Sequence, residues 1–194
     1  MSYNIEFLNL GRNNAFRIRF VSKAITFRRH WYYEGERPYP IRNCPDDCPL
    51  CETDKPQQRW AAIIEHANKF KIFEFGIVLE NQFASYYGDR LVLKKGFTLG
   101  DPNNDFDWYV ESIDNGRFPQ YVASPSDIRS DVLSVEQREG AGFYYEKMVA
   151  AFLPLTRIDV LNIMKGIVPD YKKNMIRKLK KKYPKNRWTT LEII

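Results

Sequence analysis

Hydrophobic and polar residues alternate with a period of two in several parts of the chain. Between residues 15 and 21, Phe16, Ile18 and Phe20 fall on one face, and Arg17 and Arg19 fall on the other. This pattern is typical of a half-buried strand. Further strands are predicted over residues 26–33, 70–79, 90–93, 106–113 and 117–123. The Asn-Gly pair between the last two predicts a tight hairpin.

Helical spacing of apolar residues predicts a helix over residues 55–68 and a short one over 82–87. After residue 125 the pattern becomes helical throughout. Ser126 and Asp127 are predicted to cap a helix that starts near Ile128. Further helices are predicted over residues 142–152, 156–165 and 171–183. This order favours a mainly β protein, with five or six short antiparallel strands closing into a small barrel and an α-helical extension.

The three cysteines all lie within Cys44-Pro-Asp-Asp-Cys48-Pro-Leu-Cys51. Zinc requires clustered thiolates at short fixed distances, and C-x2-C is a tight chelating turn. The prolines and aspartates around the cysteines are typical of a turn rather than of a core. An odd number of cysteines argues against a closed disulfide framework. A structural Zn²⁺ site is therefore predicted, with a redox C-x-x-C pair or free surface thiols as the alternatives.

A fourth zinc ligand must come from elsewhere in the sequence. The chain has two histidines, His30 in a predicted strand and His66 in the predicted helix. Neutral imidazole is a good zinc ligand from either position. A carboxylate of Asp46 or Asp47 is a third possibility. A site with three cysteines and His30 is the preferred interpretation, with His66 as the alternative histidine.

Charge and aromatic content point toward nucleic acid. Aromatic residues make up 15% of the chain, and its formal net charge is +6. Basic side chains contact phosphates and rings stack on bases, a combination suited to single strands. The charge is unevenly distributed, because residues 166–194 hold nine Lys or Arg against two Asp or Glu, a charge of +7, which leaves −1 for residues 1–165.

The segment from Phe16 to Phe20, then His30, then Cys44 and the run Cys48-Pro-Leu-Cys51-Glu52, resembles the single-stranded-DNA-binding proteins of T-even-type bacteriophages. The strands 71–75 and 108–110 are similar to later strands of that family. The resemblance implies a five-stranded antiparallel OB-fold barrel over residues 1–125. It implies a zinc-binding insertion at about 28–68. The residue pattern itself predicts a helical C-terminal region over 126–194 that ends in a basic helix.

The resemblance implies that the metal ligands are His30, Cys44, Cys48 and Cys51. It also implies sequence-independent binding of single-stranded DNA in replication, recombination or repair. The cations and rings predicted to contact nucleic acid are Arg17, Arg19, Lys23, Arg28, Arg29, Trp31, Tyr33, Lys71, Phe73, Trp108 and Tyr109. A cytoplasmic location, in the host if phage-encoded, is expected, because metal-bound thiols require a reducing compartment.

The chain departs from this family at its C-terminus, where a basic helix is predicted instead of an acidic tail. A different function follows from this departure. The protein would then be a zinc-containing adaptor, and the basic helix would dock on a replication or transcription complex. No apolar run predicts a membrane span or a signal peptide. The sequence contains no phosphate-binding glycine loop and no H-E-x-x-H motif, so no enzymatic activity is predicted.

Overall fold

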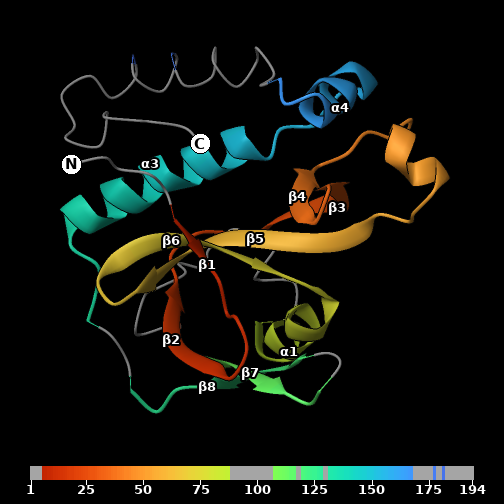
Figure 1. Cartoon of the computed structure of the whole chain (residues 1–194). Coiled ribbons are helices and arrows are strands. Elements are labelled where there is room, and N and C mark those ends of the chain that lie inside the picture. Colours follow the sequence, from red (N-terminus) through yellow and green to blue (C-terminus); the bar gives the residue numbers. More distant parts are fainter. Residues whose placement is uncertain are drawn as a thin grey trace. The chain divides into compact units, whose positions relative to one another are not determined.

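The computed structural model describes residues 6–87, 107–116, 119–128 and 131–167, together with Arg177 and Lys181 (Figure 1). This part of the chain is mainly β, with a mixed sheet and a few helices, as the sequence predicts at that level. The chain divides into two compact units. The sheet unit consists of Ile5–Ile25 and Trp60–Tyr145, and the hairpin unit consists of Met1–Asn4, Thr26–Arg59 and Glu146–Ile194.

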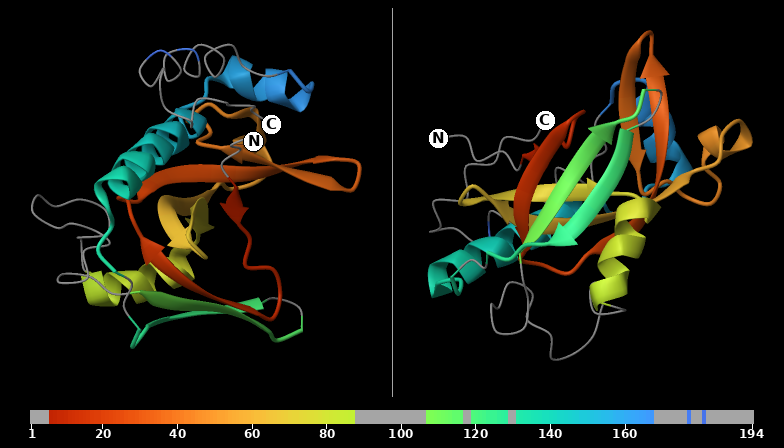
Figure 2. Two further views of the ribbon diagram at one scale, coloured as in Figure 1. Left: turned by 90° about the vertical axis from the view of Figure 1, so that its left-hand side faces the viewer. Right: turned by 90° about the horizontal axis from the view of Figure 1, so that it is seen from below.

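The strands of the sheet unit are hydrogen-bonded in the order β1-β6-β5-β2-β7-β8. Their bounds are Phe7–Leu8 for β1, Asn14–Phe20 for β2, Gln57–His66 for β5, Lys69–Phe75 for β6, Trp108–Asp114 for β7 and Pro119–Pro125 for β8. β1 is parallel to β6, and the other pairs are antiparallel. β7 and β8 form the predicted Asn-Gly hairpin, which lies beside β2 in Figure 2.

The core of the sheet unit lies on the inner face of these strands. β2 pairs with β7 over Asn14–Ile18 and with β5 at Arg19 and Phe20, so it joins the two halves of the sheet. Phe20, Phe83 and Trp108 are fully buried there. The Phe83 ring meets Phe20 and Trp108 edge to face, at centroid distances of 5.0 and 4.7 Å, a favourable geometry for aromatic pairs.

Helix α1 (Ile77–Tyr87) lies along the edge of β8 that no strand pairs with in the described residues. One side chain of α1 takes the place of a neighbouring strand there. The amide nitrogen of Gln82 donates to the carbonyl of Tyr121 at 3.0 Å. Its amide oxygen accepts from the backbone N–H of Ala123 at 2.6 Å. One side chain thus satisfies two backbone groups that a neighbouring strand would otherwise pair.

Replacing Gln82 by leucine is therefore expected to destabilise the sheet unit. The change leaves one partly buried carbonyl and one partly buried N–H without the partner that Gln82 provides, a loss of about 2–4 kcal/mol. Urea denaturation measures this difference. Asn81→Leu is the matched control, because Asn81 precedes Gln82 on the same helix and its side chain is exposed. Equal stability of the two variants would contradict the bridging role of Gln82.

The hairpin unit is built around β3 (Ile25–Glu34) and β4 (Arg37–Arg42), which pair with each other as an antiparallel ribbon, and β3 also pairs with β5. Pro40 lies opposite Trp31, and Pro38 lies opposite Tyr33. A proline fits a paired strand only where its nitrogen faces away from the partner. The outer edge of β4 therefore lacks N–H donors at both prolines and cannot accept a further strand there.

One of the remaining elements of the hairpin unit follows β4 closely, and the others come from much later in the sequence. The 3-10 helix η1 (Pro49–Glu52) carries the end of the cysteine loop. Helix α3 (Val135–Ala151) begins in the sheet unit and ends in the hairpin unit, and α4 (Arg157–Met164) follows it. The side chain of Thr156 caps α4 in a capping box with Asp159, which confirms the helix predicted at 156–165.

Two predicted elements are wrong in the middle of the chain. Residues 57–66 form strand β5 and not a helix, so His66 lies on a strand. β5 is buried on both faces, with Ile63 and Ile64 both fully inaccessible. It therefore shows no alternation, and its alanines and isoleucines also fit helical spacing. The strand predicted over 70–79 ends at Phe75, and α1 begins after Gly76.

The helix predicted to start near Ile128 is also absent from its described residues, which are non-helical through Ser134. The helix starts instead at Val135, where Ser134 and Gln137 form a reciprocal cap with N···O distances of 2.8 and 3.1 Å. The S-x-x-Q pattern of a capping box was the missed signal. The strand predicted at 90–93 lies outside the described residues, as does all but Arg177 and Lys181 of the helix predicted at 171–183.

Candidate metal centre and the predicted contact residues

The turn before Cys44 aims the cysteine loop back at strand β3. Asn43 adopts a left-handed conformation with a φ of 58°, which asparagine tolerates better than most residues. Its N–H donates to the carbonyl of Arg28 at 2.7 Å, and the N–H of Cys51 donates to the carbonyl of Cys48 at 3.0 Å. Pro49 opens η1 with the fixed φ that such a turn requires. The loop thus folds through local hydrogen bonds.

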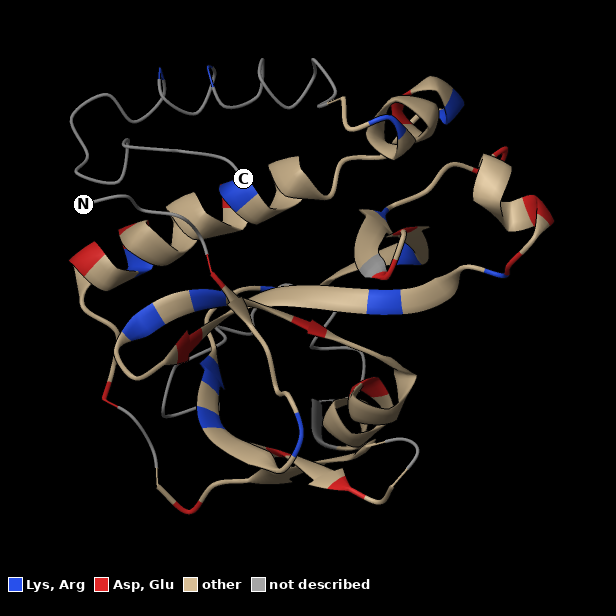
Figure 3. Cartoon of the chain, in the orientation of Figure 1, with Lys and Arg blue, Asp and Glu red and all other residues tan. Residues whose placement is uncertain are grey.

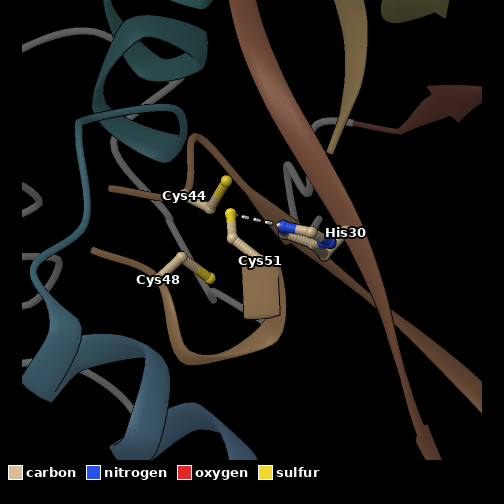
Figure 4. Close-up of side chains that lie close together, drawn as sticks. All are labelled: His30, Cys44, Cys48 and Cys51. Carbon is tan, nitrogen blue, oxygen red and sulfur yellow. Dashed lines mark hydrogen bonds between the residues drawn. The ribbon is translucent and has the colours of Figure 1, made fainter. Parts of the chain in front are cut away.

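Four potential metal ligands converge in this loop. The thiol sulfurs of Cys44, Cys48 and Cys51 and a ring nitrogen of His30 all lie within 4.8 Å of one another. Figure 4 shows the thiols and the imidazole gathered at one point, and His30 Nε2 lies 3.1 Å from the Cys51 sulfur. Ligands around one tetrahedral zinc are about 3.5–3.8 Å apart, as follows from the usual Zn–S and Zn–N lengths. The cluster could therefore hold one metal ion such as zinc after a small contraction.

Burial favours the neutral forms of these groups in the absence of a metal. Burial, together with the neighbouring Cys48 and Cys51 thiols, raises the pKa of Cys44 to about 12. Burial and Cys48 also raise the pKa of Cys51. Burial lowers the pKa of His30, Arg28 acts in the same direction, and Asp54 opposes them. The histidine is thus held in the neutral form that metals bind, whereas two of the thiols must lose protons to do so.

Metal binding is accordingly expected to release at least two protons at pH 7, from Cys44 and Cys51. The sign follows from their raised pKa values: these thiols are protonated at pH 7, and affinity for the metal falls as the pH is lowered. Calorimetric titration with Zn²⁺ in two buffers of different ionisation enthalpy gives the number of protons released. Release of none would show that the metal does not bind the thiolates.

The cluster is covered by a segment from far along the sequence. Leu155 and Val160 are buried in one apolar cluster with Cys44 and Cys48, and Ile163 and Met164 pack against it. The N–H of Leu155 donates to the carbonyl of Asn43 at 3.1 Å. Arg157 donates to the carbonyl of Asp47 at 2.8 Å. The sequence alone does not predict this cover, because residues 155–164 contain no local pattern that indicates contact with the cysteine loop.

The alternative fourth ligands lie elsewhere. His66 belongs to the sheet unit, where its Nδ1 donates to the carbonyl of Arg17 at 3.0 Å. Asp46 is exposed and pairs with Arg28 at 2.7 Å. Within the described residues, His30 is the histidine that the fold brings to the three cysteines.

Most of the predicted phosphate contacts already have carboxylate partners. Arg19 is buried and pairs with Glu65, and it also donates to the carbonyl of Asp131. In the same unit, Arg17 pairs with Asp107 at 3.3 Å and Lys71 with Glu6 at 3.2 Å, and Lys23 is exposed. In Figure 3 the strands of this unit carry both blue and red segments between them. Arg19 is thus a structural residue, which corrects its prediction as a phosphate contact.

The two predicted arginines of the hairpin unit serve its structure. Arg28 donates to the carbonyl of Cys44 at 3.0 Å. Arg29 is buried, donates to the Gln57 side chain at 2.9 Å and lies 4.4 Å above the Trp31 ring. Arg28 therefore holds the cysteine loop, and Arg29 supports the β3–β4 ribbon through its stacking on Trp31.

The predicted stacking rings divide between core and surface. Phe73 and Trp108 are fully buried in the core of the sheet unit, and their prediction as exposed rings is wrong. Both lie on the inner face of their strands, where alternation directs the large apolar residues. Tyr109, opposite Arg17 on the outer face, is 44% exposed. Tyr33 is 61% exposed near the tip of the ribbon, Tyr39 of β4 is 40% exposed, and Trp31 is half-buried.

No helix in the described ranges is long and apolar enough to cross a membrane. Comparison with protein-family models, with curated proteins and with solved structures gave no match to this chain.

Proposed function

We propose that this protein binds single-stranded DNA without sequence preference and that the cluster of His30, Cys44, Cys48 and Cys51 holds one structural Zn²⁺. The observation that carries the proposal is the position of the cluster. It lies at the base of a ribbon whose far end exposes Tyr33 and Tyr39. Exposed rings next to cations are the surface that single strands use, because every base can stack.

Zinc suits this donor set better than harder metals. Three thiolates and an imidazole are soft or borderline ligands, which favour zinc over magnesium or calcium. The four residues would fill the tetrahedral coordination of the ion and leave no open position, so the metal would supply folding energy and no catalysis. Its work would be to fix the ribbon against the cysteine loop.

We read the sheet unit as an OB-fold barrel, on the strength of its short antiparallel strands and of α1 across the β8 edge. OB folds bind single strands through stacking and phosphate contacts. In this chain Arg17 and Tyr109 lie directly opposite each other on β2 and β7, on the exposed face. Such contacts carry little base information, so binding is expected to be sequence-independent.

Fluorescence anisotropy tests the proposal. At low salt, a labelled single strand of about 16 nucleotides, the upper end of OB-fold site sizes, should bind at least ~10-fold more tightly than the matching duplex. Equal affinity for the two, or no binding of either, would overturn the function. Metal content by mass spectrometry tests the zinc separately, since a structural site should contain one ion per chain.

The separation of charge along the chain favours a second function. Residues 166–194 carry +7 and the rest of the chain −1. A basic segment attached to a neutral body suits an adaptor that docks on an acidic protein of a replication or transcription complex. A chain that binds no single strand but binds such a protein would support this function instead.

A further inference from the structure

We infer that α4 and the connector before it form a lid over the cysteine loop, that this lid must open before the metal can leave, and that Asn43 latches it shut. The connector consists of residues 152–155, between α3 and α4. The inference rests on the proposed metal site and adds a residue that controls the rate of metal exchange. Asn43 is a positioning residue, since it is not one of the four candidate ligands.

The lid hides two of the thiols that a competing chelator would have to replace. Cys44 and Cys48 are buried in one apolar cluster with Leu155 and Val160. Cys51 is only half-buried and is the most accessible of the three thiols. A chelator extracts a four-coordinate ion by replacing its ligands in turn, so access to Cys51 alone is not enough. Metal exchange therefore requires Leu155 and Val160 to move away.

Asn43 bonds to the connector on both sides of Pro154. Its side-chain N–H donates to the carbonyl of Phe152 at 2.6 Å, and its backbone carbonyl accepts from the N–H of Leu155 at 3.1 Å. Pro154 has a fixed φ, which keeps the two bonded groups in one stiff segment. The N–H of Asn43 also donates to the carbonyl of Arg28 on β3, the strand that carries the histidine ligand. One residue thus connects the ligand strand to the lid.

The lid itself is short enough to open without the rest of the unit. Helix α4 has 8 residues, and a helix of that length is marginal in water without tertiary contacts. Val160 is its fully buried anchor, and Arg157 donates to the carbonyl of Asp47 at 2.8 Å. Ile158 and Leu161 are exposed. Elements with few buried contacts open at a lower free energy than the whole structure. We therefore expect the lid to open while the β3–β4 ribbon stays folded.

Two measurements on the zinc-loaded, full-length protein test the lid. The first is the rate at which an excess of a chromogenic chelator removes Zn²⁺. The second is hydrogen exchange over residues 155–167, with the β3–β4 ribbon as the internal reference. The latch variant is Asn43→Gly, which tolerates the left-handed conformation and lacks the side-chain bond. Asn68→Gly is the matched control, because Asn68 also has a left-handed φ, of 59°, and is exposed in the sheet unit.

Asn43→Gly should speed both zinc loss and exchange over residues 155–167 by about 2–12-fold, the usual effect of losing one hydrogen bond. Exchange in the ribbon should stay at the wild-type rate, whereas a general loss of structure would speed it as well. Asn68→Gly should change neither zinc loss nor lid exchange.

A second pair of variants tests the lid independently of Asn43. Val160→Ala removes buried apolar contacts from the inner side of α4 and should speed zinc loss and lid exchange by the same factor, at least ~10-fold. Leu161→Ala, at the next and exposed position of the helix, should change both by less than ~2-fold. Thermal melting shows that each variant is folded.

The outcomes separate the lid from the metal site. Zinc loss and lid exchange that respond to Val160→Ala by different factors would overturn the inference, because the metal would then leave without the lid opening. Wild-type rates in Asn43→Gly would overturn it too, since Asn43 would not be a latch. The proposed metal site stands in both cases. A wild-type protein that takes up no zinc removes the site itself, and the lid over it as well.

Discussion

Replacing Cys48 by serine is expected to abolish metal binding and to unfold the hairpin unit at room temperature. Cys48 is 1% exposed, and its sulfur is one of four donors within 4.8 Å. Structural zinc contributes about 10–16 kcal/mol in zinc-finger peptides, and losing one ligand removes much of it. The free energy of unfolding should fall by at least ~4 kcal/mol. Metal content and thermal melting with and without a chelator measure the two effects.

The two histidines provide a matched control for this result. His30→Ala should behave like Cys48→Ser, because it removes a donor from the same cluster. His66→Ala should retain the full metal content. It loses only one hydrogen bond to the Arg17 carbonyl and an edge contact with Phe16, about 1 kcal/mol in total. Equal metal loss in both histidine variants, or a metal-free Cys48→Ser protein that melts like the wild type, would contradict a structural site.

Replacing Trp108 by alanine is expected to cost about 3–5 kcal/mol of stability, the usual effect of truncating a buried aromatic side chain. Its ring is fully buried and packs edge to face on Phe83. Tyr109, the next residue along β7, faces the opposite side of the sheet and is 44% exposed. Tyr109→Ala should therefore change stability by less than ~0.5 kcal/mol. Urea denaturation of both variants measures the difference.

The comparison also tests the corrected role of Trp108. A surface stacking residue would lose DNA binding on truncation and keep its stability. A core residue loses stability, and the protein that remains folded keeps its binding. A stable Trp108→Ala protein with weakened DNA binding would restore the prediction made from the sequence.

The sequence predicted strands well where one face meets solvent. β2 and β7 alternate because Arg17 and Tyr109 lie on the exposed face of their strands, and that alternation is visible in the sequence. β5 was mistaken for a helix because both of its faces are buried, so burial left no periodic trace. β4 was missed because Pro38 and Pro40 resemble a turn. In the structure they lie in a strand whose outer edge needs no donors.

The four candidate metal ligands could be predicted because their chemistry is local. Cys44, Cys48 and Cys51 lie within one loop, and His30 precedes them on the adjoining strand. Solvent exposure of the predicted contact residues was not predictable. The pairing of Arg19 with Glu65 depends on the register of β2 against β5. Residue type alone could not show that this arginine is buried and forms an ion pair with Glu65.

The cover of the cysteine loop has a consequence for biosynthesis. His30 and the cysteines leave the ribosome early, whereas Leu155 and Val160, which bury the cysteines, follow about 100 residues later. At translation rates of about 5–20 residues per second, that interval lasts about 5–20 s. During it the nascent loop presents three uncovered thiols. Capture of a metal ion at this stage would protect them from oxidation until α4 emerges and closes the site.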